Sequence, residues 1–450
     1  MTDHSQPVRH EPTIIPRSEH NISRADISKS ALKVLYRLKD AGYKACLVGG
    51  SVRDLLLGRH PKDFDVATDA HPEEVRALFG NCRLIGRRFR LAHVRYGREI
   101  IEVATFRGLG TEAMSSEHRE VSAETGRLIR DNVYGSIEED VWRRDFTANA
   151  LYYDIADFSV WDFVGGFADV QARQLRLIGD PELRYPEDPV RMLRAARFAA
   201  KLGFTVHPET AAPMARLAHL VDGVPAARLF DEFLKLFQTG HALASYRELR
   251  RFGLFEHLFA ATARWLGPGG DARERFIEQA LASTDARVAA EQPVTPMFLF
   301  GVLLWGPVGD RTVELTGQGM ADYQALAQAA AELTRLQTER IALPRRFSIP
   351  MREMLQLQSR FDKTQGARAL AFLESKRFRA AYDLLMLRAA VGNADADLAH
   401  WWTTIQSLPP EQQRREIGLD REGAGRKRRR GGRRGSRGRA GAVSGPSPSA

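Results

Sequence analysis

Two aspartates, Asp63 and Asp65, stand two residues apart in the segment Asp-Phe-Asp, where the sequence predicts a strand over residues 63–66. Alternation along a strand places both side chains on one face. Two carboxylates so close raise each other's pKa unless a cation lies between them. Mg²⁺ accepts a few carboxylates together with substrate phosphates, and two such ions about 3.5–4 Å apart can activate a hydroxyl and stabilise a leaving pyrophosphate. We therefore predict that Asp63 and Asp65 bind metal.

A glycine pair lies shortly before these aspartates. A predicted strand over residues 44–48 runs into Gly49 and Gly50, and a predicted helix over residues 52–57 follows. Glycines allow backbone to approach a phosphate closely, and a helix directs its positive end towards that position. Arg53 adds a guanidinium whose geometry matches phosphate oxygens. Each feature alone is common in turns and solvated loops, but their combination within 17 residues favours a phosphate and metal site.

A third acid, Glu102, lies on a strand predicted over residues 99–106. If this strand is the neighbour of the strand that carries Asp65, Glu102 completes the metal cluster. The alternative is a structural carboxylate, and the sequence leaves both interpretations open.

The segment from Leu47 to Gly58, followed by Asp-Phe-Asp, resembles the head of the bacterial poly(A) polymerase and CCA-adding nucleotidyltransferase family, in the polymerase-β-like superfamily. The resemblance covers about residues 29–259. It implies an α/β nucleotidyltransferase head with a small mixed sheet and helices, followed by an all-α neck and body. It also implies two-metal nucleotidyl transfer with Mg²⁺, for which Mn²⁺ can substitute, and ATP as a substrate.

A second arginine-rich motif, Arg143-Arg144-Asp145, lies on a helix predicted over residues 138–152. It is similar to the family's Arg-Arg-Asp motif, which implies contacts with the sugar and the phosphates. Asp145 then accepts a hydrogen bond from the ribose 2′-hydroxyl and belongs to the active-site set. An arginine beside it can hold a triphosphate oxygen. The other interpretation is a row of exposed helix charges.

A helix predicted over residues 187–202 begins with Glu-Asp-Pro. Asp188 and Arg191 are three residues apart, so we expect them on one face, with an acceptor beside a donor. Adenine and cytosine present the complementary donor and acceptor, whereas uracil and guanine present the reverse. The resemblance implies that this pair selects the base and that Arg194 helps to bind the triphosphate. The alternative is an ordinary surface ion pair, worth about 0–1 kcal/mol.

The net charge of +10 is concentrated at the C-terminus, because residues 421–450 hold ten basic residues and one acid. A flexible basic tail binds RNA without regard to sequence and with strong salt dependence. Together with the segment from Leu84 to Val94, which resembles the poly(A) polymerase branch, it favours that branch over CCA addition. The candidate RNA-binding residues of the tail are Arg426, Lys427, Arg428, Arg429, Arg430, Arg433 and Arg434.

The sequence predicts a disordered segment 1–25, a catalytic head 26–180, a helical neck 181–260 that binds the nucleotide base and RNA, a helical body 261–415 that binds RNA, and a disordered Arg-rich tail 416–450. Breaks are expected at Gly267–Gly270, Pro307 and Pro344, and a loop over residues 108–135. Two cysteines at unremarkable spacing indicate neither a disulfide scaffold nor a zinc site. No apolar stretch approaches the ~20 residues that span a bilayer, so we expect a cytoplasmic protein without membrane contact.

We therefore expect AMP transfer from ATP to RNA 3′ ends, on mRNA and on small and structured RNAs, with RNA-decay machinery as a further partner that the resemblance suggests. Two alternatives stay open: a CCA-adding tRNA nucleotidyltransferase, and a non-catalytic RNA-binding protein with an inactive transferase head. A metal-dependent phosphohydrolase is disfavoured because no His-Asp pair occurs in the sequence.

Overall fold

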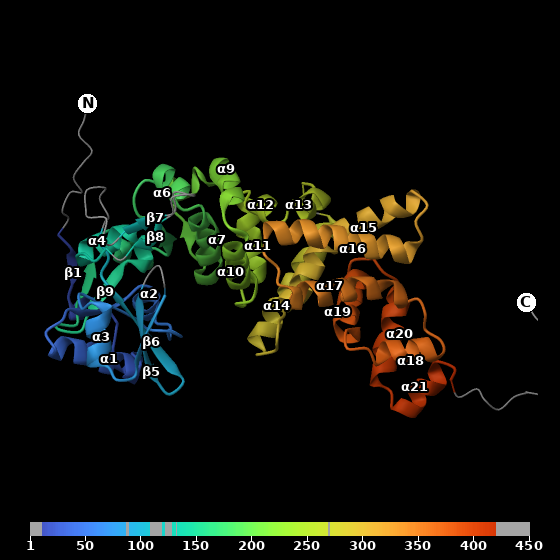
Figure 1. Cartoon of the computed structure of the whole chain (residues 1–450), viewed down its shortest axis with the longest axis horizontal. Helices are drawn as coiled ribbons and strands as arrows, with labels where there is room; N and C mark the ends of the chain where they lie inside the picture. Colours follow the sequence, from blue (N-terminus) through green and yellow to red (C-terminus); the bar gives the residue numbers. More distant parts are fainter. Residues whose placement is uncertain are drawn as a thin grey trace, which may run out of the picture.

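The structure is a computed structural model that describes residues 11–86, 90–108, 119–121, 128–131, 133–268 and 271–419. The predictions for residues 87–89, for Gly269–Gly270 and for the tail from residue 420 lie outside these ranges. An α/β head, a helical neck and a helical body follow one another in an elongated row (Figure 1). This arrangement confirms the predicted α/β head and the predicted helical remainder.

The head is built on one mixed sheet of eight strands in the order β1-β10-β9-β2-β3-β6-β5-β4. Strands β3 and β6 pair in parallel, and the other neighbours pair antiparallel. Strand β2 is buried along its whole length, so it forms the centre of the sheet. The strands are β1 (Thr13–Ile15), β2 (Ala45–Val48), β3 (Asp65–Thr68), β4 (Cys82–Ile85), β5 (Leu91–Tyr96), β6 (Glu99–Thr105), β9 (Leu151–Asp154) and β10 (Val160–Asp162).

Short helices cover this sheet and connect its strands. Helix α1 buries Ala31, Val34, Leu35 and Leu38, the spacing of an amphipathic helix, and the hydroxyl of Ser28 caps its N-terminus. Helices α1 and α3 lie side by side at the base of the head in Figure 1. The helices of the head are α1 (Lys29–Asp40), α2 (Gly50–Leu56), α3 (Pro72–Leu78), α4 (Ile137–Arg143) and α5 (Gly166–Gln171).

Two predictions for the head are wrong. The described part of segment 1–25 is ordered, because β1 pairs with β10 and extends the sheet by one strand. The helix predicted over residues 138–152 ends at Arg143, and a 3-10 turn at Thr147–Asn149 leads into β9. Strand β9 is completely buried between β2 and β10, so tertiary burial outweighs the local helical pattern.

Further boundaries differ from the sequence predictions. The strand expected near residues 175–178 is β11 (Gln174–Leu175), which pairs with β12 (Thr205–Val206) outside the main sheet. The predicted loop 108–135 contains an antiparallel pair, β7 (Arg119–Val121) and β8 (Leu128–Asp131).

No break occurs at Pro307, which lies inside helix α15 (Pro296–Gly317). Proline cannot donate to the carbonyl four residues before it. Here the hydroxyl of Thr262 donates to that carbonyl, of Leu303, at 2.7 Å. The helix therefore continues through the proline without leaving a buried acceptor unpaired.

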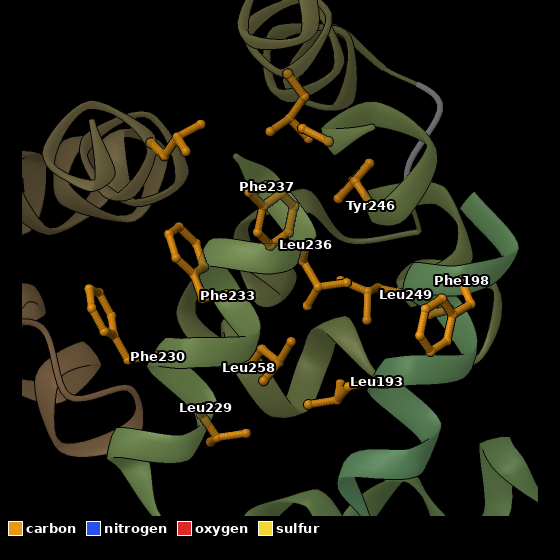
Figure 2. Close-up of a cluster of buried hydrophobic side chains, with 14 of the residues drawn as sticks. Leu193, Phe198, Leu229, Phe230, Phe233, Leu236, Phe237, Tyr246, Leu249 and Leu258 are labelled. Carbon is orange, nitrogen blue, oxygen red and sulfur yellow. The ribbon is translucent and has the colours of Figure 1, made fainter. Parts of the chain in front are cut away.

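The neck has an apolar core, which Figure 2 shows between α7, α10 and α11. Phe233 of α10 lies at its centre and reaches the body, because its ring centroid is 4.1 Å from that of Phe300 in α15. The helices of the neck are α6 (Pro181–Glu187), α7 (Val190–Leu202), α8 (Pro208–Ala211), α9 (Met214–Leu217), α10 (Ala226–Phe237), α11 (Ala242–Arg251) and α12 (Phe255–Leu258).

The body consists of packed helices, with α15 and α16 forming the long hairpin on the right of Figure 1. The helices are α13 (Ala260–Leu266), α14 (Ala272–Ala289), α15 (Pro296–Gly317), α16 (Asp322–Arg340), α17 (Arg345–Gln356), α18 (Ala367–Leu373), α19 (Phe378–Ala390), α20 (Ala396–Ser407) and α21 (Pro410–Glu416). The predicted break at Pro344 is confirmed, because α17 begins directly after it.

Candidate active site

A cleft of about 1150 Å³ lies between the head and the neck. The N-terminus of α2, the start of β3, the turn before β9, the junction of α6 and α7, and helix α10 all contribute to its walls. It brings together nearly all the site residues predicted from the sequence. They are Gly49, Gly50, Arg53, Asp63, Asp65, Arg143, Arg144, Asp145, Asp188, Arg191 and Arg194.

The paired aspartates lie where the chain enters β3, which begins at Asp65, so Asp63 precedes the strand that was predicted to start there. Phe64 between them is buried, so the alternation leaves Asp63 and Asp65 exposed in the cleft. Within the described residues, neither carboxylate accepts a hydrogen bond or forms an ion pair. Loss of hydration, together with the nearby charges of Glu102 and Asp63, raises the pKa of Asp65 to about 6, although Arg144 acts against this shift. The two carboxylates therefore lie in the cleft without an ion pair to a described residue, and Arg144 is the nearby opposing charge.

Glu102 occupies the strand next to β3, which was the condition for its possible place in the metal cluster. Strands β3 and β6 pair in parallel with Asp65 opposite Glu102. However, Oε1 of Glu102 lies 3.2 Å from Nε2 of His93, and Glu102 does not line the cleft. Across the described ranges, no group of three acidic, histidine or cysteine side chains is placed to hold a metal ion. A metal-binding role for Glu102 thus stays a prediction, and its contact with His93 supports the structural alternative.

The backbone conformation at the first glycine of the pair, Gly49, explains the residue type there. Gly49 precedes α2 with φ 75° and ψ −133°, a region that side chains strongly disfavour. A Cβ on Gly49 would also lie 3.6 Å from Nη1 of Arg144, and one on Gly50 would lie 3.4 Å from Nη2 of Arg53. The bare backbone therefore leaves space beside two guanidinium groups.

Arg53 is held by a buried network. Its Nε and Nη2 atoms donate to Oδ1 of Asp54 at 2.9 and 2.7 Å, and Nη1 donates to the amide oxygen of Asn149. Asn149 in turn donates to Asp145 at 3.3 Å. Because each of its three nitrogen atoms is engaged, Arg53 contributes a positive charge that is fixed in place, and the second hydrogen of Nη1 and of Nη2 can still donate.

Asp145 links the head to the neck. It lies in the turn after α4, and its Oδ2 accepts a hydrogen bond from Nε of Arg194 on α7 at 2.6 Å. Burial alone would raise the pKa of Asp145, but Arg194, with hydrogen bonds from Asn149 and the backbone of Phe146, lowers it below its usual value. Asp145 is therefore an ionised acceptor at neutral pH.

The two preceding arginines have different partners. Arg144 donates to Oδ2 of Asp140 at 2.8 Å and to the hydroxyl of Tyr152 at 2.8 Å. Burial would lower the pKa of Arg144, but Tyr152 and Asp140 raise it, so this side chain remains charged. Arg143 donates to the carbonyl of Gly108 at 2.6 Å. Both arginines line the cleft; Arg143 is the last residue of α4, as the predicted helix required, whereas Arg144 lies just beyond its end.

The predicted base-selecting residues also lie in the cleft, but not on one helix. Helix α6 ends at Glu187 and α7 begins at Val190, so Asp188 lies in the junction between them. Asp188 accepts from Arg228 of α10 at 2.7 Å, whereas Arg191 donates to Glu187 at 2.7 Å. The alternative of a simple ion pair between Asp188 and Arg191 is therefore wrong.

Several residues of the cleft were not singled out from the sequence. Asp54, Asn149 and Arg228 orient the predicted residues, and a basic group lines one end of the cleft. No local pattern marks these residues, because they meet only when distant elements pack together. The basic group comprises Arg59, His60, Lys62, Lys201 and His241.

A glycine turn, unpaired carboxylates and fixed arginines in one cleft are the features of a nucleotidyltransferase, and the model of the Poly A polymerase head domain matches residues 45–176. The Poly(A) polymerase I of Salmonella typhi is 52% identical over 93% of this chain and 91% of that protein. The Poly(A) polymerase I of Haemophilus influenzae is 45% identical over 91% of each. The chain belongs to the poly(A) polymerase I family.

Other comparisons agree with this placement. Two further family models match, the "Probable RNA and SrmB- binding site of polymerase A" over residues 203–266 and the "Polymerase A arginine-rich C-terminus" over residues 318–435. The CCA-adding enzyme of Lactobacillus helveticus is 37% identical over only 49% of the chain and 53% of that protein. The prediction of poly(A) polymerase rather than CCA addition is thus confirmed, and the family implies RNA binding and ATP as substrate.

Solved structures share the fold. The CCA-adding enzyme of Bacillus stearothermophilus in complex with CTP is 26% identical, with a TM-score of 0.54, covering 83% of this chain and 80% of that one. The Thermotoga maritima CCA-adding enzyme complexed with tRNA has a TM-score of 0.57 and is 20% identical, over 87% of this chain and 85% of that one. At this identity, the likeness shows the fold alone. Within the described ranges, every helix is too short or too polar to cross a membrane.

Proposed function

We propose that this poly(A) polymerase holds two Mg²⁺ ions at Asp63 and Asp65, with Mn²⁺ able to substitute. The observation that carries this proposal is the pair of exposed carboxylates that have no partner in the part of the chain that the structure describes, one of them with a pKa raised to about 6. Hard cations take oxygen ligands, and magnesium in particular completes its shell with water and substrate phosphates. When bound, the ions would activate the RNA 3′-hydroxyl and neutralise charge on the phosphates.

The protein's own groups would bind and orient ATP. The backbone at Gly49 and Gly50 leaves space for phosphate oxygens, and Arg53 supplies a fixed positive charge beside them. Arg144 and Arg194 are also held by carboxylates, so their orientation precedes substrate binding. Such preorganised charge stabilises the charge that develops on the transferred phosphoryl group.

We assign recognition of the sugar to Asp145 and of the base to Asp188 and Arg191. Asp145 is an ionised acceptor, which suits a ribose 2′-hydroxyl. An Asp188 oxygen that already accepts from Arg228 retains a lone pair for the amino group of adenine. Arg191 is oriented by Glu187 and would donate to N1 of adenine. We further propose that Arg143 contacts the triphosphate.

The RNA would extend from the cleft along the neck and body. We propose that the neck, residues 181–260, and the body, residues 261–415, support the RNA, and that the tail binds its phosphates through its arginines. The family match at residues 203–266 supports RNA contact by the neck. We further propose that the substrates are cytoplasmic mRNAs and small structured RNAs, and that the added tails direct them to the RNA-decay machinery.

Primer extension tests the site assignment. Purified protein would be incubated with an unstructured labelled RNA, Mg²⁺ and one nucleotide at a time, and ATP alone should give long ladders. Asp63→Ala and Asp65→Ala should abolish transfer and leave RNA binding within about twofold, because both carboxylates act on chemistry. Glu99→Ala, an exposed carboxylate of the same sheet, is the matched control. Near-normal activity of either aspartate variant would refute the assignment.

A further inference from the structure

One end of the cleft contains a group of basic side chains that the nucleotide site does not use. The loop between α2 and β3 contributes Arg59, His60 and Lys62, the end of α7 contributes Lys201, and the residue before α11 is His241. All five line the same cleft as the paired aspartates. We call them the basic end of the cleft.

These side chains lie close enough to affect one another's charge. Burial lowers the pKa of Lys201, and nearby like charges, among them Lys62, lower it further. Burial and neighbouring cations, again including Lys62, also lower the pKa of His241. Two separate elements, the loop between α2 and β3 and the end of α7, therefore bring positive charge to one place, whereas the lowered pKa of His241 favours its neutral form.

The nearby acids offset this charge only in part. Asp54 opposes the shift at Lys201 but is engaged by Arg53, and Asp285 opposes the shift at His241 but accepts the backbone N–H groups at the start of α11, at 2.6 and 3.1 Å. Within the described residues, the side chains of Lys62 and Lys201 form no ion pair or hydrogen bond. An anionic ligand would supply the missing counter-charge.

The basic end differs in character from the nucleotide site. Arg53, Arg144 and Arg194 are fixed by carboxylate or amide partners, which suits a ligand bound in one pose. Lysines are mobile point charges on flexible stems, which suits a phosphate chain that moves by one nucleotide after each addition. Lys62 directly precedes Asp63, so an anion held there lies beside the carboxylates.

We propose that Lys62 and Lys201, with Arg59, bind a backbone phosphate of the RNA primer next to its 3′-terminal nucleotide. This inference rests on the proposed assignment of the carboxylates and arginines to the chemistry and to ATP. Nucleotidyl transfer brings two polyanions into one cleft, and the fixed arginines already account for the triphosphate. The basic end is then the position of the second polyanion, the RNA.

Binding of a short RNA tests the proposal without catalysis. The affinity of the full chain for a five-nucleotide oligoadenylate would be measured over a range of salt concentrations, without ATP. Lys62→Gln and Lys201→Gln should each weaken binding about three- to tenfold and reduce the slope of log K against log salt by about 0.7. Lys39→Gln, an exposed lysine of α1, is the matched control and should change neither quantity.

A chemical change in the RNA identifies the contact. One phosphodiester at a time would be replaced by an uncharged methylphosphonate, starting at the linkage nearest the 3′ end. At the contacted linkage, this replacement should weaken the binding of the RNA to the parent chain. It should weaken binding to the Lys201→Gln variant little further, because the contact is already lost there. Such non-additivity in a double-mutant cycle indicates a direct contact.

Two results would overturn the proposal. The first is that the losses of binding free energy caused by the lysine substitution and by the methylphosphonate add fully at every linkage. The second is that both lysine variants bind the RNA with unchanged affinity. A rise in the KM for ATP with unchanged RNA affinity would place the triphosphate at the basic end instead. The binding assay needs no turnover, so its result does not depend on the catalytic assignment. Retained activity of Asp63→Ala or Asp65→Ala would refute the catalytic assignment, whereas unchanged RNA binding by the lysine variants would refute the proposed RNA contact.

Discussion

The exposed carboxylate of Asp65 should be a source of instability in the metal-free protein. Its pKa is raised from 3.8 to about 6. At about 1.36 kcal/mol per pKa unit, this shift corresponds to an upper limit of roughly 3 kcal/mol. Because Asp65 is exposed, solvent screening reduces the figure, and we expect a penalty of about 1–1.5 kcal/mol. Asp65→Asn should therefore stabilise the chelator-treated protein by about that amount.

The pH dependence gives this prediction its sign. A carboxyl group whose pKa is raised in the folded state does not lower the stability at a pH below its pKa in the unfolded state, since it is then protonated in both states. The penalty grows between pH 3.8 and about 6, where the unfolded chain releases the proton more readily, and it is complete above pH 6. The parent chain should thus lose stability relative to Asp65→Asn as the pH rises through this window.

Thermal unfolding in EDTA at pH 4 and pH 8 measures the effect. For a domain of this size, 1 kcal/mol shifts the Tm by about 2–4 °C, so Asp65→Asn should unfold about 2–6 °C higher at pH 8 and show little difference at pH 4. Added Mg²⁺ should raise the Tm of the parent but not of the variant. Glu99→Gln is the control. The reasoning would be refuted if Asp65→Asn raised the Tm equally at both pH values, or did not raise it at pH 8.

Three further substitutions test the packing and the cleft. Phe233→Ala should destabilise the neck by about 3–5 kcal/mol in urea unfolding, because this buried ring joins α10 to α15; a loss below 1 kcal/mol would contradict it. Gly49→Ala should cost about 1–3 kcal/mol of stability through its backbone conformation and raise the KM for ATP, and an unchanged KM would count against the glycine turn as a phosphate site. Asp188→Ala should relax the preference for ATP over UTP about tenfold in primer extension, whereas retained selectivity would exclude Asp188 from base recognition.

The local chemistry of the site was largely predictable. Gly49 and Gly50, Arg53 and the alternation of Asp63 and Asp65 around Phe64 depend on neighbouring residues, and the structure places them together in the cleft. The pairing of Asp65 with Glu102 was expected only conditionally, because it needs the parallel register of β3 and β6. The contact of Glu102 with His93 depends on a third strand, which no spacing in the sequence reveals.

Contacts between distant segments were not predictable from local pattern. Asp145 was expected on a helix, but the burial of β9 ends that helix early and leaves Asp145 in a turn, where Arg194 reaches it. The separation of Asp188 from Arg191 follows from a helix break at Pro189 and from Arg228, which lies 40 residues later. Such pairs depend on how α7 and α10 pack against the head.

The proposed site is complete only where head and neck meet. The carboxylates at Asp63 and Asp65 belong to the head, whereas Arg194 and the proposed base-contacting residues, Asp188 and Arg191, belong to the neck. Arg194 holds Asp145 across this junction, and the ring of Phe198 packs 5.8 Å from that of Phe146 beside it. A buried carboxylate that loses its partner is strongly destabilised, so the junction resists separation. Because the same contact fixes the proposed ribose acceptor, Asp145, and the proposed triphosphate arginine, Arg194, this assignment lets one interaction position both the choice of nucleotide and the chemistry.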